Sequence, residues 1–230
     1  MRWRSLIALG LVAAVIHPQL AAGQDTRPGI AVWTFENGGS YGLEKEDYDA
    51  FQVGLQQMLI TELAVNTDLR LVDRNRLNQL IAEQDLGVSG RVDAATAAQV
   101  GKIVGAKYVI LGGFIDWYAD FRFDARIVDV ETSEIINAQG VRGNRENMFD
   151  MVVELADKVT RGVDLEPLSN NIIQERKDIE LSEEAIRLYT KGLFYAERGD
   201  NDRAIELFSQ VTREFPEYTP AHEALRQVGG

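Results

Sequence analysis

Carboxylates are the side chains of this 230-residue chain best placed to do chemistry. Asp116, Asp120 and Asp124 recur at every fourth residue in a region whose pattern predicts strand and turn. Side chains alternate between the two faces of a strand, so these three would share a face and could hold a calcium ion. Charged residues on the surface of a hairpin show the same spacing. We favour this second interpretation.

Three other features have both a chemical and a structural interpretation. The acidic cluster at 44–49 could bind a cation, but carboxylates in the first turn of a helix also stabilise it through its dipole. Gly112 and Gly113 follow a predicted strand and could let a ligand approach, although such glycines more often mark a bend. The tryptophans Trp33 and Trp117 lie in apolar surroundings, which predicts that both pack in the core rather than form a binding platform.

The side chains that most enzymes use are scarce. The chain has no cysteine and only two histidines, His17 and His222, which excludes disulfides, thiolate metal sites and a cysteine nucleophile. His222 lies beside Glu223 on an expected terminal helix, where an exposed histidine is the simplest interpretation. No phosphate-binding loop of the G-x-x-x-x-G-K-[ST] type is present. We therefore predict that the protein is not an enzyme and has no catalytic, cofactor-binding or metal-binding residues.

The composition is that of an acidic globular protein. Hydrophobic residues make up 45% and charged residues 26%, while 36 acidic residues face 24 basic ones, for a net charge of −12. Since such a chain repels phosphate backbones, we expect no nucleic-acid partner.

Residues 1–23 have the layout of a secretory signal peptide. Arg2 and Arg4 precede an apolar run at 6–16, and small residues follow at Ala22 and Gly23, after either of which cleavage fits. A membrane-spanning helix needs roughly 20 apolar residues, more than this run supplies. A lipoprotein would need a cysteine at the cut. The expected product is an exported, unlipidated protein without a transmembrane span, located in the periplasm and peripheral to the outer membrane.

Residues 28–164 alternate between strand and helix patterns. The early strands are apolar on both faces and joined through helices, which predicts parallel neighbours, whereas the later strands alternate and are joined by tight turns, which predicts antiparallel ones. In chain order the patterns predict a strand at 30–35, helix at 44–63, strand at 69–72, helices at 77–81 and 97–104, strands at 108–111, 121–127 and 135–141, and a helix at 148–163. The predicted fold class is a mixed-sheet α/β sandwich.

The C-terminal part predicts a small helical hairpin after a linker at 165–181. Residues 182–230 carry the spacing of a tetratricopeptide-like repeat, with small residues where two helices approach and large ones in the seam between them. The residues that carry this signature are Leu188, Gly192, Tyr195, Ala204, Phe208 and Pro216. By this similarity, the concave face of the first helix would present a protein-binding set of Ile186, Tyr189, Leu193 and Glu197.

Four segments, taken in order, resemble the CsgG family of curli assembly and secretion proteins. They are Ile30-Ala31-Val32 with Phe35-Glu36-Asn37, Leu71-Val72-Asp73-Arg74 leading to Glu83-Gln84, the run from Gly105 to Gly113, and Val128-Asp129-Val130-Glu131-Thr132. The resemblance implies a mixed α/β sandwich over about 28–163. Similar domains occur in lipoprotein activators of penicillin-binding proteins and at the start of TolB.

The chain departs from the curli secretion channels of that family in two ways. It has no cysteine to lipidate. The intervals at 117–126 and 140–146 are also too short for the long membrane hairpins of a channel, whose strands need ~9–11 residues each. We therefore expect that this protein does not form the pore itself.

The leading hypothesis is an exported, non-enzymatic envelope adaptor that supports secretion or assembly of extracellular, curli-like fibres and binds envelope proteins or another copy of itself. The alternative is a regulator that binds and activates a cell-wall synthase. A third hypothesis, a hydrolase or small-ligand-binding domain, would use the region from Gly112 to Asp116.

Overall fold

The computed structural model describes residues 25–83 and 92–230. The predicted signal peptide at 1–23 lies outside the described residues. Within the described ranges, no helix combines the length and the apolar composition that crossing a bilayer would require.

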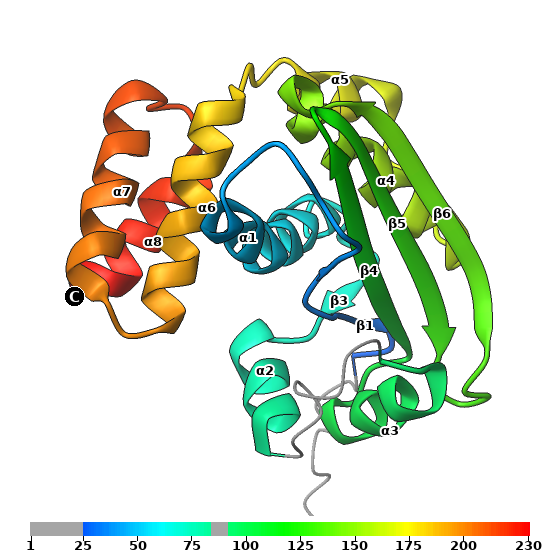
Figure 1. Ribbon diagram of the computed structural model, residues 1–230. Coiled ribbons are helices and arrows are strands. Elements are labelled where there is room, and N and C mark those ends of the chain that lie inside the picture. Colours follow the sequence, from blue (N-terminus) through cyan, green and yellow to red (C-terminus); the bar gives the residue numbers. More distant parts are fainter. Residues whose placement is uncertain (1–24, 84–91) are drawn as a thin grey trace, which may run out of the picture.

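The centre of the fold is a six-stranded mixed sheet with the order β3-β1-β4-β5-β6 (Figure 1). β1 (Gly29–Val32) lies parallel to both β3 (Arg70–Leu71) and β4 (Tyr108–Trp117). The short β2 (Glu36–Asn37) continues beside β4. β4, β5 (Asp120–Asp129) and β6 (Ile135–Asn144) form a long antiparallel meander of ten-residue strands. The predicted change from parallel to antiparallel pairing is confirmed.

Helices cover both faces of this sheet, which confirms the mixed α/β fold class. On one face, α1 (Lys45–Leu63) and α4 (Met148–Gly162) bury the aromatic and aliphatic side chains of β4 and β5. On the other, α2 (Arg74–Glu83) and α3 (Ala94–Val104) cover a smaller core around Trp33, Val109 and Val128. A one-turn 3₁₀ helix, Arg145–Asn147, joins β6 to α4.

β4 is longer than its sequence pattern predicted. It continues through Gly112 and Gly113 to Trp117 instead of ending in a bend. A Cβ atom on Gly112 would lie 2.5 Å from the ring of Phe35, so the glycine leaves room for this core side chain. The extra residues of β4 carry the sheet beyond the two helices on its second face.

The predicted linker at 165–181 contains a helix, α5 (Asn170–Lys177). Ser169 caps its first turn by accepting a hydrogen bond from the backbone N–H of Ile172 at 3.4 Å. Arg176 then forms a two-pronged ion pair with Glu62 of α1, at 2.7 and 2.9 Å, where Glu62 is 3% exposed. This ion pair holds the segment against the α/β domain. The local sequence could not reveal it, because Glu62 is distant in the chain.

The C-terminal residues form three helices, α6 (Glu183–Glu197), α7 (Asn201–Glu214) and α8 (Thr219–Gly229). α6 and α7 approach closely at Gly192, whose Cβ would lie 2.4 Å from the ring of Phe208, as the predicted helix pairing requires. The membership of this region in the tetratricopeptide family stays a prediction. α1 lies between the sheet and these helices, so the C-terminal region packs on the α/β fold instead of extending from it (Figure 1).

Candidate functional site

Among the described residues, no helix lies over one half of the second sheet face. α2 and α3 cover Val109 and Leu111 of β4 and Val128 of β5, and all three are buried. Further along the same strands, Ile115 and Trp117 on this face are 40% and 58% exposed. We call this uncovered surface the open face and define it by Ile115, Trp117, Asp120, Arg122, Asp124, Arg126 and Arg142.

Three aromatic side chains gather at the tip of the β4–β5 hairpin, beside the open face. Tyr41, Trp117 and Tyr118 are 54%, 58% and 70% exposed. The ring of Tyr41 stands edge-on to that of Trp117 with centroids 5.1 Å apart, and Trp117 meets Tyr118 at 6.0 Å. The prediction that both tryptophans are core residues is thus right for Trp33, which is 5% exposed, and wrong for Trp117. The longer β4 takes Trp117 past the covering helices.

The turn that presents these rings is strained. Tyr118 and Ala119 have φ values of 51° and 73°, in the left-handed region that glycine and asparagine adopt at lower energetic cost than other residues. Positive φ at both central residues is the backbone of a two-residue hairpin turn usually built from Asn-Gly. Backbone strain of this kind persists only where the surroundings enforce it, and it concentrates at functional sites.

Replacing the turn by Asn-Gly (Tyr118→Asn with Ala119→Gly) is expected to stabilise the protein by about 1–2 kcal/mol, because both residues then suit their φ values. Urea denaturation of the variant and the original protein measures this difference. The control is Ser133→Gly, because Ser133 also has a positive φ (62°) but lies away from the tip. It measures how much stability is gained when glycine replaces one residue at positive φ. An unchanged or lower stability of the Asn-Gly variant would show that the turn is not strained.

Charged side chains of the open face pair with one another, with one exception. Arg122 holds Asp124 through two nitrogens at 2.7 and 2.8 Å, and Arg142 pairs with Asp120 across the two strands. Arg126 is half-buried and makes no ion pair or hydrogen bond with the described residues. The open face therefore offers one guanidinium that its own carboxylates leave available.

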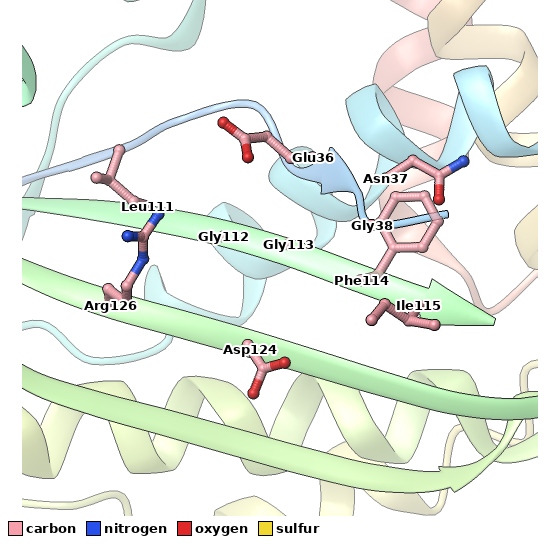
Figure 2. Close-up of a pocket in the computed structure, with 10 residues that line it drawn as sticks. All are labelled: Glu36, Asn37, Gly38, Leu111, Gly112, Gly113, Phe114, Ile115, Asp124 and Arg126. Carbon is pink, nitrogen blue, oxygen red and sulfur yellow. The ribbon is translucent and has the colours of Figure 1, made fainter. Parts of the chain in front are cut away.

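A shallow cavity of about 270 Å³ lies beside Arg126 (Figure 2). Gly112 and Gly113 line its base, and Asn37 and Ile115 lie at its other end. The Arg126 side chain rises from β5 and passes over β4 next to Leu111. A second hollow of about 280 Å³ shares Ile115 with this cavity and is lined by Trp117 and the Arg142–Asp120 pair, so the two are continuous along the open face.

The three aspartates of the sequence do not form a common cation site. Asp116 points to the opposite sheet face, where it is fully buried, whereas Asp120 and Asp124 lie on the open face. The intervening hairpin turn breaks the alternation on which the shared face was predicted. Each aspartate instead has an arginine partner. Within the described ranges, no group of three or more histidine, aspartate and glutamate side chains is arranged to hold a metal ion.

Asp116 supports the hairpin tip from behind. It forms an ion pair with Arg145, accepts a hydrogen bond from the Tyr48 hydroxyl at 3.0 Å, and accepts another from the backbone N–H of Ala119 at 2.9 Å. Arg145 also reaches Glu183 of α6 at 2.7 Å. Burial and the hydrogen bond to Asp116 raise the pKa of Tyr48 to about 12. This network connects the strained turn, α1 and the C-terminal helices.

The acidic cluster at 44–49 contacts α6. Glu46 and Asp47 lie in the first turn of α1, as the helix-dipole interpretation predicted. Asp47 is 3% exposed, and the ammonium of Lys191 lies 2.8 Å from it. These carboxylates therefore have a second role, which is to hold α6 against α1.

The predicted protein-binding set lies on the face of α6 that packs against the rest of the protein. Ile186, Tyr189 and Leu193 are 0%, 2% and 7% exposed, while the side chain of Glu197 is 28% exposed and pairs with Arg74 at 2.6 Å. α1 and α8 cover the surface that a free-standing repeat would present. Only an edge of Tyr189 and Leu193 borders a cleft. A contact role for these four residues stays a prediction.

The open face is the surface that sequence reasoning missed. The sequence predicts Asp120 and Asp124 as charged residues on the surface of a hairpin, but their continuity with Trp117 depends on the length of β4. The alternation of Ile115 and Trp117 with the buried Phe114 and Asp116 is the signal that could have revealed it.

One similar solved structure is the LpoB C-terminal domain from Escherichia coli, with 21% identity and a TM-score of 0.41 over 54% of this chain and 87% of that one. A second is the NMR structure of E. coli LpoB, with 18% identity and a TM-score of 0.39 over 62% of this chain and 82% of that one. A third is the PelC dodecamer from Paraburkholderia phytofirmans, with 14% identity and a TM-score of 0.35 over 62% of this chain and 90% of that one. No curated protein was found to match. A family described as curli production assembly/transport component CsgG matches residues 13–122, and this part of the chain is similar to that family.

Proposed function

We propose that the protein is an exported, non-enzymatic binding component of the bacterial envelope, and that it docks a partner protein on the open face. The observation that carries this proposal is the half-sheet that the described helices leave uncovered beside α2 and α3, with exposed aromatic rings and an arginine that pairs with no described residue. Protein interfaces are enriched in tyrosine, tryptophan and arginine, and these are the residues that contribute most to binding.

Arg126 supplies the open face with a guanidinium that can pair with a carboxylate of the partner, although Glu36 and Asp124 line the same cavity. Its guanidinium has five N–H donors, and the two neighbouring arginines of the face are already occupied by Asp124 and Asp120. A partner residue with an acidic side chain would enter the cavity over Gly112 and Gly113, while apolar side chains would pack on Ile115 and Trp117.

The process that the partner serves has two candidates. Secretion or assembly of extracellular, curli-like fibres follows from the description of the matched family. Regulation of a cell-wall synthase is the second, because the sequence also resembles the lipoprotein activators of penicillin-binding proteins. The open face and its aromatic tip suit this second role, since exposed aromatic rings at a hairpin tip can pack on a folded enzyme domain. In both cases we place the protein in the periplasm, peripheral to the outer membrane.

Crosslinking in living cells, followed by affinity capture, tests the proposal and separates the two processes. Recovery of a cell-wall synthase, together with a rise in its turnover when the purified protein is added, supports the regulator. Recovery of a fibre-secretion component or fibre subunit supports the adaptor. Crosslinks between copies of this chain alone would contradict both and point to a homo-oligomer.

Replacing Trp117 by alanine is expected to weaken binding of the captured partner about 30-fold, which corresponds to the ~2 kcal/mol of a hot-spot residue. Because the side chain is 58% exposed, stability should change by no more than about 0.5 kcal/mol. A titration of the partner measures the affinity. The matched control is Ile103→Ala, which removes an exposed apolar side chain (49%) from α3, outside the open face. Equal affinities of the two variants would remove Trp117 from the interface.

A further inference from the structure

A second cleft, of about 390 Å³, lies where the α/β fold meets the C-terminal helices. Residues of α1, of the segment at 71–75, of α6 and of α8 line it, so it exists only because α6 and α8 pack against α1 and the start of α2. It shares no residue with the open face. Its size is within the range of pockets that accept a side chain with adjoining backbone.

Tyr189 places a hydroxyl group without a described protein partner at this cleft. The residue is 2% exposed, and its ring packs against Phe208 and Tyr218, with centroids 5.9 and 5.2 Å away. Its hydroxyl forms no hydrogen bond with a residue in the described ranges, and its oxygen is not among the fully buried atoms that lack a partner, so it opens to the cleft. Burial raises the pKa of this hydroxyl, while the nearby charges of Arg74 and Glu223 act on it in opposite directions. It therefore remains an O–H donor at neutral pH.

The charges around the hydroxyl are unbalanced. Arg74, the cation that lines the cleft, is already engaged by Glu197 at 2.6 Å. Asp73 uses one carboxylate oxygen to accept a hydrogen bond from the backbone N–H of Arg76 at 2.8 Å, and it has no ion pair with a described residue. Glu223 on α8 likewise has no hydrogen-bonding or ionic partner in the part of the chain that the structure describes. Two carboxylates that line the cleft thus have no cationic partner among the described residues.

We propose that this cleft binds a basic peptide segment of a partner protein. The ammonium or guanidinium of a lysine or arginine is held by Asp73 and Glu223, and a backbone carbonyl of the same segment accepts the hydrogen bond of the Tyr189 hydroxyl. Gln57 and Gln227, which also line the cleft, supply amide groups for the remaining backbone contacts. The site prefers a cation, whereas Arg126 of the open face can pair with a carboxylate.

An NMR titration of the purified protein with acetyl-Gly-Lys-Gly-Lys-Gly-amide tests this proposal, with acetyl-Gly-Gln-Gly-Gln-Gly-amide as the uncharged counterpart. The lysine peptide is expected to shift the backbone amide signals of Asp73, Tyr189 and Glu223 in a saturable manner, and the glutamine peptide is expected to bind at least about tenfold more weakly. Equal binding of the two peptides, or shifts elsewhere only, would overturn the proposal.

Two variants test the named groups without disturbing the fold. Tyr189→Phe keeps the packed ring and removes only the unpartnered hydroxyl, so its thermal unfolding should not fall while its affinity for the lysine peptide falls about fivefold. Glu223→Gln should weaken binding about tenfold. Glu206→Gln on α7 makes the same charge change outside the cleft and should leave the affinity as it was. Unchanged affinity in both cleft variants would mean that the hydroxyl and the carboxylate take no part in binding.

Discussion

Replacing Asp116 by alanine is expected to lower the free energy of unfolding by about 3 kcal/mol, as for a buried ion pair that loses one partner. Asp116 is fully buried and is shared by the Arg145 guanidinium, the Tyr48 hydroxyl and the backbone N–H of Ala119. Its removal leaves three donors facing an empty space. Glu183 still contacts Arg145, which keeps the cost at the lower end of the range for such pairs.

Asp120→Ala is the matched control for this measurement. Asp120 lies on the same hairpin and also pairs with an arginine, but the side chains of Asp120 and Arg142 are 46% and 71% exposed. Removing such an exposed pair costs between roughly 0.2 and 1 kcal/mol. Urea denaturation of both variants measures the difference. If Asp116→Ala and Asp120→Ala lower the free energy of unfolding by similar amounts, the buried network stabilises the protein no more than an exposed ion pair does.

Replacing Gly54 by alanine is expected to destabilise the protein by about 2 kcal/mol, although alanine is favoured over glycine within a helix by up to ~1 kcal/mol. The added Cβ would lie 2.0 Å from the Cγ2 of Thr190 and 2.4 Å from its Cβ, so α1 and α6 would have to separate. The two helices hold the C-terminal region on the sheet domain. The change therefore loosens the packing of α6 that also forms the cleft at Tyr189.

A double variant identifies this steric cause. Adding Thr190→Gly to Gly54→Ala removes the atoms that clash, and a double-mutant cycle should give a favourable coupling of about 1–2 kcal/mol. Gly229→Ala is the control, because nothing lies within 4 Å of the Cβ it would add in α8. Additive effects of the two changes would contradict a close contact between Gly54 and Thr190.

Local patterns of the sequence were sufficient to predict most elements of the α/β fold, although not the two-residue β2 or the full length of β4. The alternation of Phe121 and Phe123 with Arg122 and Asp124 identified β5, and the four-and-three spacing in 148–163 identified α4. Both patterns are read from neighbouring residues, and burial of one face enforces them in the fold. The sharp change from helical connections to tight turns also predicted the switch from parallel to antiparallel pairing.

The functional surfaces depend on contacts between distant residues, which local patterns do not contain. The face of α6 with Ile186 and Tyr189 was predicted to be open because a repeat helix has that face free, but α1 and α8 cover most of it. The length of β4 was underestimated because Gly112 and Gly113 resemble a bend, whereas Gly112 makes room for Phe35. In both cases the deciding partner is remote in sequence.

The docking of a partner on the open face is tested most directly by site-specific photocrosslinking in cells. A photoreactive residue at position 117 should give one predominant crosslinked protein, identified as a cell-wall synthase or a fibre-secretion component. Arg126→Ala in the same chain should reduce the product, and a photoreactive residue at position 102, on α3 outside the open face, should not give it. The same products from positions 117 and 102, or no product from position 117, would contradict the account.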